Sequence, residues 1–301
     1  MTKRIFEGVL PAITTPFSPD GSVDHEFLRE HAQWMMSQGC SGMVPLGSLG
    51  EGNTLEFDEK VAILKTLVEA LGDKPVIPGI ASLSTQGAVK LAQAAKDAGC
   101  QGLMVLPPYV YTSDWREMKA HMSAVIAATD LPVILYNNPV AYKTDFLPQQ
   151  ILELAGEHPN VRGVKESSTD VRRVTALAAI LPPQVELLVG VDDALLEGVL
   201  AGATGWIAGL VNSHPRESVE LFELTRAGKY AEATRLYRWF LPLLRLDTVP
   251  KFVQLIKFVQ EETGHGSARV RAPRLELTDA EKAEARQVLA AAQASPALVG
   301  V

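Results

Sequence analysis

The sequence predicts an α/β fold, a (β/α)8 TIM barrel followed by a C-terminal helical extension. Eight short apolar runs alternate with helical patterns, and eight is the number of parallel strands that closes such a barrel. The runs are too apolar to have a solvated face, as expected of parallel strands that are covered on both sides. The candidate strands are Val9–Ile13, Met43–Leu46, Pro75–Ile80, Leu103–Leu106, Pro132–Tyr136, Val161–Val164, Val185–Val189 and Gly205–Leu210.

A weak internal repeat supports this alternation. Residues 39–42, 99–102 and 202–205 read GCSG, GCQG and GATG, and each segment follows a helical pattern and precedes an apolar run. The first glycine of each segment suits the position after a helix end, where the backbone turns left-handed. The repeating unit is therefore a helix, a glycine turn and a buried strand.

Two of the helices can be placed from their caps and apolar stripes. The segment 54–71 is predicted to follow Thr54 as its N-cap and to end at Gly72. The segment 85–98 is predicted to follow Ser84 in the same way. Their apolar stripes are Val61, Leu64, Val68 and Leu71 in the first helix and Ala88, Leu91, Ala92 and Ala95 in the second.

After Pro215 the pattern becomes wholly helical. Four helices are predicted, at 217–227, 230–246, 249–263 and 279–292. A barrel needs less helix than this, so we expect the barrel to span residues 1–225 and a helical region packed on it to span 226–301. An open doubly wound sheet is the alternative, but no G-x-G-x-x-G segment opens the first helix.

Composition argues against several classes of function. The 28 Lys and Arg residues and 35 Asp and Glu residues give a net charge of −7 without a basic block, so we expect no nucleic-acid partner. No apolar run approaches the ~20 residues of a membrane span. The apolar stretch before Pro11 is too short to act as a signal peptide. Cys40 and Cys100 are too few for a disulfide framework or a structural zinc site. These features predict a cytoplasmic enzyme.

Lys165 is the sharpest candidate for chemistry. It closes a strand that should be buried, at the strand end where barrel active sites lie. Lysine is rarely buried unless it is paired or neutral. Burial favours the neutral amine, which is the form that attacks a carbonyl to make a Schiff base. The alternative is a salt bridge with a carboxylate from a neighbouring strand.

Two other strand ends lie within reach of this lysine. Tyr136 ends the neighbouring strand, about 4.8 Å away, so its phenol could act on the amine or its adduct as a general acid or base. The glycine-rich loop 47–52 lacks the lysine of a P-loop, but its backbone N–H groups and the Ser48 hydroxyl could bind a carboxylate. Each feature also has a plain structural interpretation, as a packed tyrosine and as an ordinary turn.

A metal-dependent barrel enzyme is a rival interpretation. The six histidines are scattered, and none are paired with H-x-x-x-H spacing. Asp192 and Asp193 could bind a hard metal ion, although two aspartates before a helical run more often cap the helix. Four aromatic residues are expected in the core or in a subunit interface: Trp239, Phe240, Phe252 and Phe258.

Taken in order, the motifs resemble those of the dihydrodipicolinate synthase/N-acetylneuraminate lyase family over nearly the whole chain. The resemblance implies a (β/α)8 barrel with a C-terminal helical region, assembled as a homotetramer. It also implies a class I lyase that needs no cofactor or metal and forms a Schiff base with a 2-oxo acid. The matching segments are GVLPAITTPF at 8–17, GSLGE at 47–51, PPY at 107–109, YNNP at 136–139, GVKESS at 163–168, GVDD at 190–193, GWIAG at 205–209, VPK at 249–251 and VRAP at 270–273.

The resemblance also assigns roles by position. Lys165 would form the Schiff base, and Tyr136 would carry protons with Ser48 hydrogen-bonded to it. The Ser48 hydroxyl and the Leu49 backbone would hold the substrate carboxylate. The predicted substrate-binding residues are Gly47, Ser48, Leu49, Tyr109 and Ile207. Trp206 and Tyr142 are further residues that could shape the pocket.

Three departures separate this chain from the synthases of the family. Ser48 and Leu49 stand where the synthases have two threonines, Ala141 stands at their carboxylate-binding arginine, and Val110 stands at a tyrosine that reaches into a neighbouring active site. These changes argue against aspartate semialdehyde as a substrate.

The stretch YNNPVAYKTD is more similar to the pyrroline-4-hydroxy-2-carboxylate deaminases of hydroxyproline breakdown, which release ammonia and form 2-oxoglutarate semialdehyde. This is the specific function that we expect. The alternatives are a dihydrodipicolinate synthase-like enzyme, another 2-keto-3-deoxy acid aldolase or dehydratase, and a non-catalytic barrel that binds a 2-oxo acid.

Overall fold

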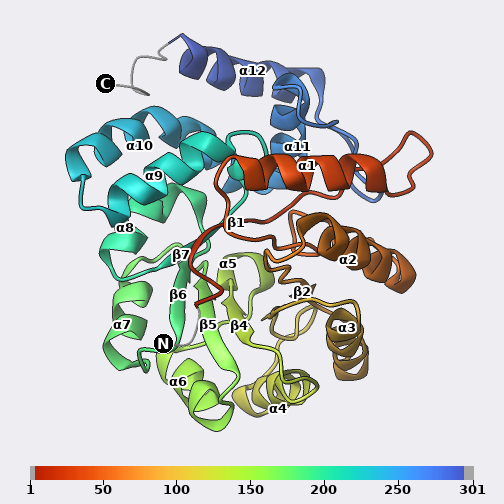
Figure 1. Ribbon diagram of the computed structural model, residues 1–301, viewed down its shortest axis with the longest axis vertical. Helices are drawn as coiled ribbons and strands as arrows, with labels where there is room; N and C mark the ends of the chain where they lie inside the picture. Colours follow the sequence, from red (N-terminus) through yellow and green to blue (C-terminus); the bar gives the residue numbers. More distant parts are fainter. Residues whose placement is uncertain (1–3, 295–301) are drawn as a thin grey trace.

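A parallel sheet curls through the centre of the protein, and helices surround it (Figure 1). The computed structural model describes residues 4–294. Seven strands are hydrogen-bonded in the order β1-β7-β6-β5-β4-β3-β2. Their bounds are β1 Gly8–Pro11, β2 Gly79–Ile80, β3 Leu103–Val105, β4 Val133–Asn137, β5 Val161–Glu166, β6 Glu186–Val189 and β7 Gly205–Ala208.

The segment predicted as the second strand closes this sheet into the expected barrel. Val44 forms a parallel bridge with Ala12 after β1, and Met43 forms one with Val76 before β2. The segment therefore lies between the first and last strands of the sheet, at the eighth position. It is held by single bridges and not by a full ladder, because Pro45 has no N–H to donate. The predicted (β/α)8 barrel is confirmed.

The helices of the barrel alternate with the strands along the chain. Gly39, Gly99 and Gly202 have φ of 103°, 91° and 113°, as the glycine repeat predicts. The helices are α1 His25–Ser37, α2 Phe57–Leu71, α3 Thr85–Asp97, α4 Trp115–Ile126, α5 Pro139–Tyr142, α6 Pro148–Glu157, α7 Arg172–Ile180, α8 Leu195–Leu200 and α9 Pro215–Arg226.

The caps of α2 and α3 show where the local prediction failed and where it held. Ser84 caps α3, its hydroxyl accepting from Gly87 N at 3.1 Å, and the predicted stripe is buried. The predicted end of α2 at Gly72 is confirmed, but Thr54 as its N-cap was wrong, because the helix begins after Glu56, whose backbone N–H donates to the Glu59 carboxylate at 2.9 Å. Thr54 instead donates its hydroxyl to a carbonyl of the preceding loop. The buried face of α2 is accordingly Ile63, Leu64, Leu67 and Leu71, without Val61 and Val68.

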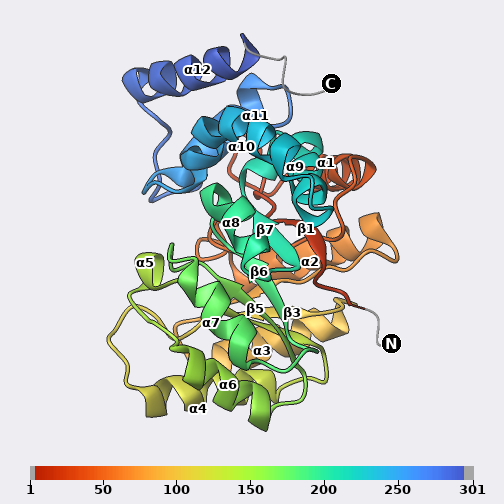
Figure 2. The ribbon, with the colours of Figure 1, turned by 90° about the vertical axis from the view of Figure 1, so that its left-hand side faces the viewer.

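The C-terminal helices gather beyond one side of the barrel (Figure 2). The four predicted helices are confirmed as α9, α10, α11 and α12. Helix α10 packs against α8 and α9, and a 3-10 turn, η3, continues it toward α11. The bounds are α10 Tyr230–Leu244, η3 Arg245–Asp247, α11 Phe252–Glu262 and α12 Asp279–Gln293. The division into domains at residue 225 stays a prediction.

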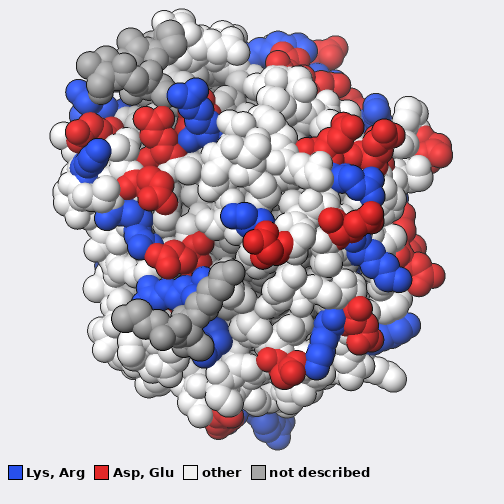
Figure 3. Space-filling view, in the orientation of Figure 1, with Lys and Arg blue, Asp and Glu red and all other residues white. Residues whose placement is uncertain are grey.

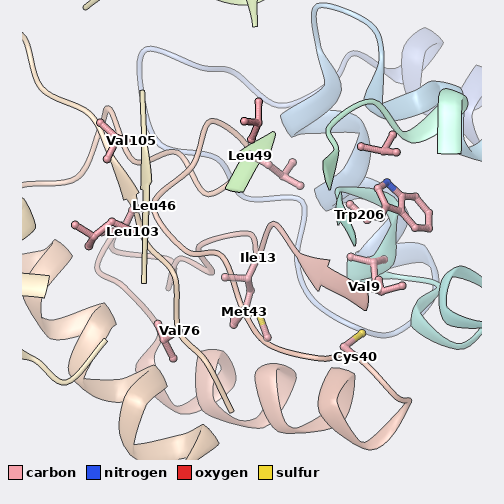
Figure 4. Packing of buried hydrophobic residues seen from close by; sticks show 14 of the residues in the cluster. Val9, Ile13, Cys40, Met43, Leu46, Leu49, Val76, Leu103, Val105 and Trp206 are labelled. Atoms are coloured by element: carbon pink, nitrogen blue, oxygen red, sulfur yellow. The ribbon is translucent and has the colours of Figure 1, made fainter. Parts of the chain in front are cut away.

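Two apolar clusters separate the inside of the barrel from its surroundings. The larger one joins the strands to the outer helices, and Figure 4 shows part of it, around Val9, Met43 and Val76. The smaller one takes residues from many strands, including Leu10, Ile134 and Ile207, and fills the barrel interior. Tyr136 belongs to this inner cluster, so the alternation along β4 directs its side chain to the interior near the strand end.

The surface gives little indication of a large charged partner. Lys and Arg side chains are interspersed with Asp and Glu side chains on the face shown in Figure 3. Many are paired; Lys119, for example, lies 2.6 Å from both Glu153 and Glu157. Within residues 4–294, no helix is both long and apolar enough to cross a membrane.

Candidate active site

A cavity of about 520 Å³ opens at the carboxyl ends of the barrel strands. One wall comes from the loop after residue 46, and another comes from α5. Residues 247–250 and Phe252, after α10, supply a third wall that the sequence did not predict. Every predicted site residue lines this one cavity: Gly47, Ser48, Leu49, Tyr109, Tyr136, Lys165 and Ile207.

Lys165 lies near the end of β5, directly opposite Tyr136 of β4 in the sheet register. The residue is only 6% exposed. Its Nζ lies 4.2 Å from the centroid of the Tyr136 ring, over the ring face. No carboxylate in residues 4–294 is within 4.0 Å of this amine, so the salt-bridge alternative is not seen.

A glycine provides the space for this lysine. A Cβ placed on Gly190 would lie 2.8 Å from Lys165 Cε and 1.9 Å from the Ser167 hydroxyl. The lysine side chain therefore runs directly over the backbone that follows β6. This close approach explains why the GVDD segment begins with glycine.

The hydroxyl next to Ser48 belongs to a different tyrosine from the one that the sequence predicted. The Ser48 hydroxyl is hydrogen-bonded to the hydroxyl of Tyr142, not to Tyr136 as predicted. The rings of Tyr136 and Tyr142 meet edge to face, with centroids 5.9 Å apart. Tyr142 thus stands between the serine and Tyr136, because α5 carries it back over the strand ends. Burial raises the pKa of Tyr142, and the adjacent Tyr136 adds to this shift.

The YNNP motif fixes the position of Tyr136. Asn138 donates from Nδ2 to the Tyr136 hydroxyl at 3.0 Å, and its Oδ1 accepts from Ala141 N, which caps α5. Asn137 is fully buried and donates to the Glu166 carboxylate of β5 at 3.1 Å. The first asparagine therefore joins two strands, while the second orients the phenol.

The glycine-rich loop presents unused donors to the cavity. Within the described part of the chain, the N–H groups of Ser48 and Leu49 donate to no acceptor. Close packing shapes the loop: a Cβ on Gly50 would lie 2.8 Å from Ile13 O, and one on Gly52 would lie 2.1 Å from Leu46 O. Two N–H groups and a hydroxyl that face one cavity can bind a carboxylate.

A buried ion pair also fixes the glycine-rich loop to the C-terminal helices. Glu51 is fully buried, and its carboxylate accepts from Lys257 Nζ of α11 at 2.9 Å and from Arg271 N at 3.0 Å. The same lysine donates to Thr15 O at 2.9 Å. The C-terminal helices thereby hold the predicted carboxylate-binding loop in place.

Asp192 and Asp193 have neither of the uses considered from the sequence. Asp192 is fully buried and accepts from Trp206 Nε1 at 3.1 Å, Gly209 N at 3.1 Å and Leu210 N at 2.8 Å. It holds the backbone after β7 and does not cap its own helix. Trp206 lies behind the cavity wall, and Asp193 lies 3.4 Å from Arg245. Over residues 4–294, no group of three or more His, Cys, Asp or Glu side chains is arranged to hold a metal ion.

Some cavity residues were missed or misplaced by the sequence analysis. Phe252 was expected in the core or an interface, but it lines the cavity. Asp247 also lines it and was not singled out; the adjacent VPK segment was the only signal for this wall. Ala141 lines the cavity, whereas Val110 is 77% exposed and lies outside it.

The comparisons with known proteins agree with this geometry. Residues 5–292 match the sequence model of the dihydrodipicolinate synthetase family. The 4-hydroxy-tetrahydrodipicolinate synthase of Natronomonas pharaonis is 35% identical over 292 residues, which cover 96% of this chain and 99% of the relative. The synthase structure from Methylacidiphilum fumariolicum superimposes with a TM-score of 0.92 at 27% identity, covering 96% of each chain. The E. coli prophage protein YagE, solved with pyruvate, gives 0.91 at 26% identity, covering 96% of this chain and 99% of YagE.

Proposed function

The chain belongs to the dihydrodipicolinate synthetase family of lyases, and within it we propose a pyrroline-4-hydroxy-2-carboxylate deaminase whose Schiff base forms on Lys165. The observation that carries the chemistry is a buried lysine amine that faces the cavity beside Tyr136 and has no carboxylate within 4.0 Å among residues 4–294. The observation that supports this choice of substrate is Ala141 of α5, which lines the cavity with a methyl group where the synthases have a carboxylate-binding arginine.

Lys165 acts as the nucleophile in this proposal. Its amine attacks the imine carbon of the substrate while the Ser48 hydroxyl and the N–H groups of residues 48 and 49 bind the neighbouring carboxylate. The protonated imine that results draws electrons from the adjacent carbon, so a proton there becomes easier to remove. Tyr136, continued by the hydroxyls of Tyr142 and Ser48, is placed to move these protons.

The reaction balances with water alone as co-reactant. Attack on the cyclic imine breaks the ring C–N bond and leaves a free amine at the far end of the opened chain. The hydroxyl then leaves as water, and proton shifts turn the terminal amine into an imine. Water hydrolyses this imine to an aldehyde and ammonia, and a second water frees the lysine. Substrate plus one net water gives 2-oxoglutarate semialdehyde plus ammonia.

The second candidate is a 4-hydroxy-tetrahydrodipicolinate synthase. The activity named for the Natronomonas pharaonis relative favours it, as does the 35% identity of that protein to this chain. Ala141 and Val110 argue against it, because neither can supply the polar group that the synthases have at these positions. The Schiff-base step on Lys165 is common to both candidates.

The two candidates are separated by assaying one preparation with both sets of substrates. We expect ammonia and 2-oxoglutarate semialdehyde from pyrroline-4-hydroxy-2-carboxylate, and no ammonia from the same ring without its hydroxyl. Lys165→Ala is the control and should be inactive throughout. Condensation of pyruvate with aspartate semialdehyde, without any deamination, would overturn the proposal in favour of the synthase. The homotetramer and the cytoplasmic location remain predictions, the first checked by light scattering.

A further inference from the structure

We propose that Asp247 recognises a hydroxyl group on the substrate, at the second carbon beyond the Schiff base, and protonates it as it leaves as water. This inference rests on the proposed function, because it requires that Lys165 form the Schiff base. It adds a residue from outside the barrel to the site and defines the substrate class as hydroxylated 2-oxo acids or their cyclic imines.

Asp247 is the last residue of η3, in the segment that follows α10. It lines the same cavity as Lys165 and Tyr136. Its carboxyl group lies directly on the backbone after β7, since a Cβ added to Gly209 would lie 2.1 Å from Oδ1 and 2.7 Å from Oδ2. The C-terminal helices thus deliver an acid to the carboxyl ends of the strands.

This acid has no partner for one of its oxygens. Asp247 Oδ1 is buried and makes no hydrogen bond within residues 4–294. The backbone N–H of Gly209, against which the carboxyl group packs, is already in use, because it and the N–H of Leu210 both donate to Asp192. A buried oxygen without a partner is costly, and such groups commonly serve a site that a ligand completes.

The charges around Asp247 favour its protonated form. Burial raises the pKa of Asp247 well above its ordinary value, and the carboxylates of Asp192 and Asp193 raise it further, whereas Lys165 opposes the shift. Burial also raises the pKa of Asp192, to about 6, although its hydrogen bonds to N–H donors lower it. Of two neighbouring acids, the one with the donors keeps the negative charge. The proton therefore resides on Asp247.

The side chains of the wall next to Asp247 offer its carboxyl group no hydrogen-bond partner, so we assign that place to the substrate. Val249, Pro250 and Phe252 form the adjacent wall and carry no polar side-chain atom. The Thr248 hydroxyl is occupied, donating to Arg245 O at 3.0 Å. A neutral carboxylic acid suits a neutral hydroxyl, whereas an ammonium group would require a carboxylate. The geometry thus points to a hydroxyl on the substrate.

The step that follows conserves atoms and charge. Removal of the proton next to the imine gives an enamine. Its electron pair forms a double bond to the hydroxyl-bearing carbon as the C–O bond breaks. Asp247 gives its proton to the departing oxygen, so water leaves and the aspartate becomes a carboxylate, to be reprotonated from solvent through the open cavity.

The test compares two 2-oxo acids that differ only in the hydroxyl, 4-hydroxy-2-oxopentanoate and 2-oxopentanoate, with pyruvate as a reference. Each is trapped on the protein with borohydride, and the apparent affinity is read from intact mass. We expect wild type to favour the hydroxylated acid by about fivefold to tenfold, the value of one hydrogen bond. Asp247→Ala should abolish this preference but trap pyruvate normally. Asp130→Asn, at a surface carboxyl that pairs with Lys96 and lies outside the cavity, is the matched control and should behave as wild type.

Asp247→Asn separates recognition from proton donation. Asparagine still donates a hydrogen bond, so the preference should persist, while ammonia release from pyrroline-4-hydroxy-2-carboxylate should fall by about 10²–10⁴-fold. If wild type trapped the hydroxylated and the unhydroxylated acid equally well, the role of Asp247 would be overturned and the proposed function would stand. Loss of pyruvate trapping in a folded Asp247→Ala protein would also overturn this role. Pyruvate has no hydroxyl, so that result would mean that Asp247 acts on Schiff-base formation by Lys165 and not on a substrate hydroxyl. No adduct with any 2-oxo acid would refute the proposed function itself.

Discussion

The ion pair between Glu51 and Lys257 offers the most direct test of how the C-terminal helices support the site. The perturbation is Lys257→Met, which keeps the length of the side chain and removes its charge. Lys257 and Glu51 side chains are 2% and 0% exposed, with 2.9 Å between Nζ and Oε1. Without the lysine, the partners left to the Glu51 carboxylate among the described residues are Arg271 N, within hydrogen-bond distance, and the Arg274 side chain at 3.6 Å.

The expected loss of stability follows from this burial. Removing one partner of a buried pair leaves the other charge buried, which costs up to about 3–5 kcal/mol, and Arg274 at 3.6 Å offsets part of this cost. Lys96→Met is the matched control, because Lys96 pairs with Asp130 at 2.6 Å but the two side chains are 48% and 79% exposed. An exposed pair contributes only about 0–1 kcal/mol. The two substitutions therefore differ by several kcal/mol for the same chemical change.

Urea unfolding, followed by circular dichroism and tryptophan fluorescence, measures both effects. The double variant Glu51→Gln with Lys257→Met should be more stable than Lys257→Met alone, because no charge is then left buried. Lys257→Met should also raise KM, since Glu51 ends the loop that we propose binds the substrate carboxylate. If Lys257→Met and Lys96→Met lowered the free energy of unfolding by equally small amounts, this reasoning would be refuted. A double variant less stable than either single variant would also refute it.

Three further substitutions test other parts of the account. Tyr136→Phe should lower kcat and leave KM nearly unchanged, because the ring remains and only the proton carrier is lost; an effect confined to KM in steady-state assays would indicate a binding role instead. Gly190→Ala should abolish pyruvate trapping, since the added Cβ meets Lys165 Cε at 2.8 Å, whereas Gly156→Ala, in open space on α6, should trap normally and gain about 0.5–1 kcal/mol in urea unfolding. Burial raises the pKa of Glu186 from 4.5 to about 7, so the folded protein holds a proton that the unfolded chain has released. Stability should therefore fall as the pH rises from about 4.5 to 7, by at most about 3 kcal/mol; Glu186→Gln should remove this fall, and an unchanged pH profile of the melting temperature would contradict it.

The barrel was predictable because its evidence is local and repeated. Each strand is a short apolar run, and glycines such as Gly39 and Gly99 mark the turns before them. Lys165 and Tyr136 could be found for a related reason: a polar residue at the end of a buried strand stands out in the sequence. Parallel strands bring such ends to one edge, so neighbours in the sheet become neighbours in the site.

What could not be predicted depends on how distant segments meet. Tyr142 lies six residues after Tyr136, and only the short α5 turn carries it back to Ser48. Asp192 resembles a helix cap in the sequence, but its donors come from Trp206 and the backbone after β7. Asp247 lies in a helical region whose packing on the barrel has no local signal. Such partners follow from tertiary contacts and not from residue spacing.

The central claim is that the Lys165 amine forms a Schiff base with a 2-oxo acid. Borohydride trapping with pyruvate, read by intact mass and peptide mapping, tests it most directly. The account predicts one adduct per chain, on Lys165, and none in Lys165→Ala. Folded protein that forms no adduct, or forms it on another lysine such as Lys257, would contradict the account.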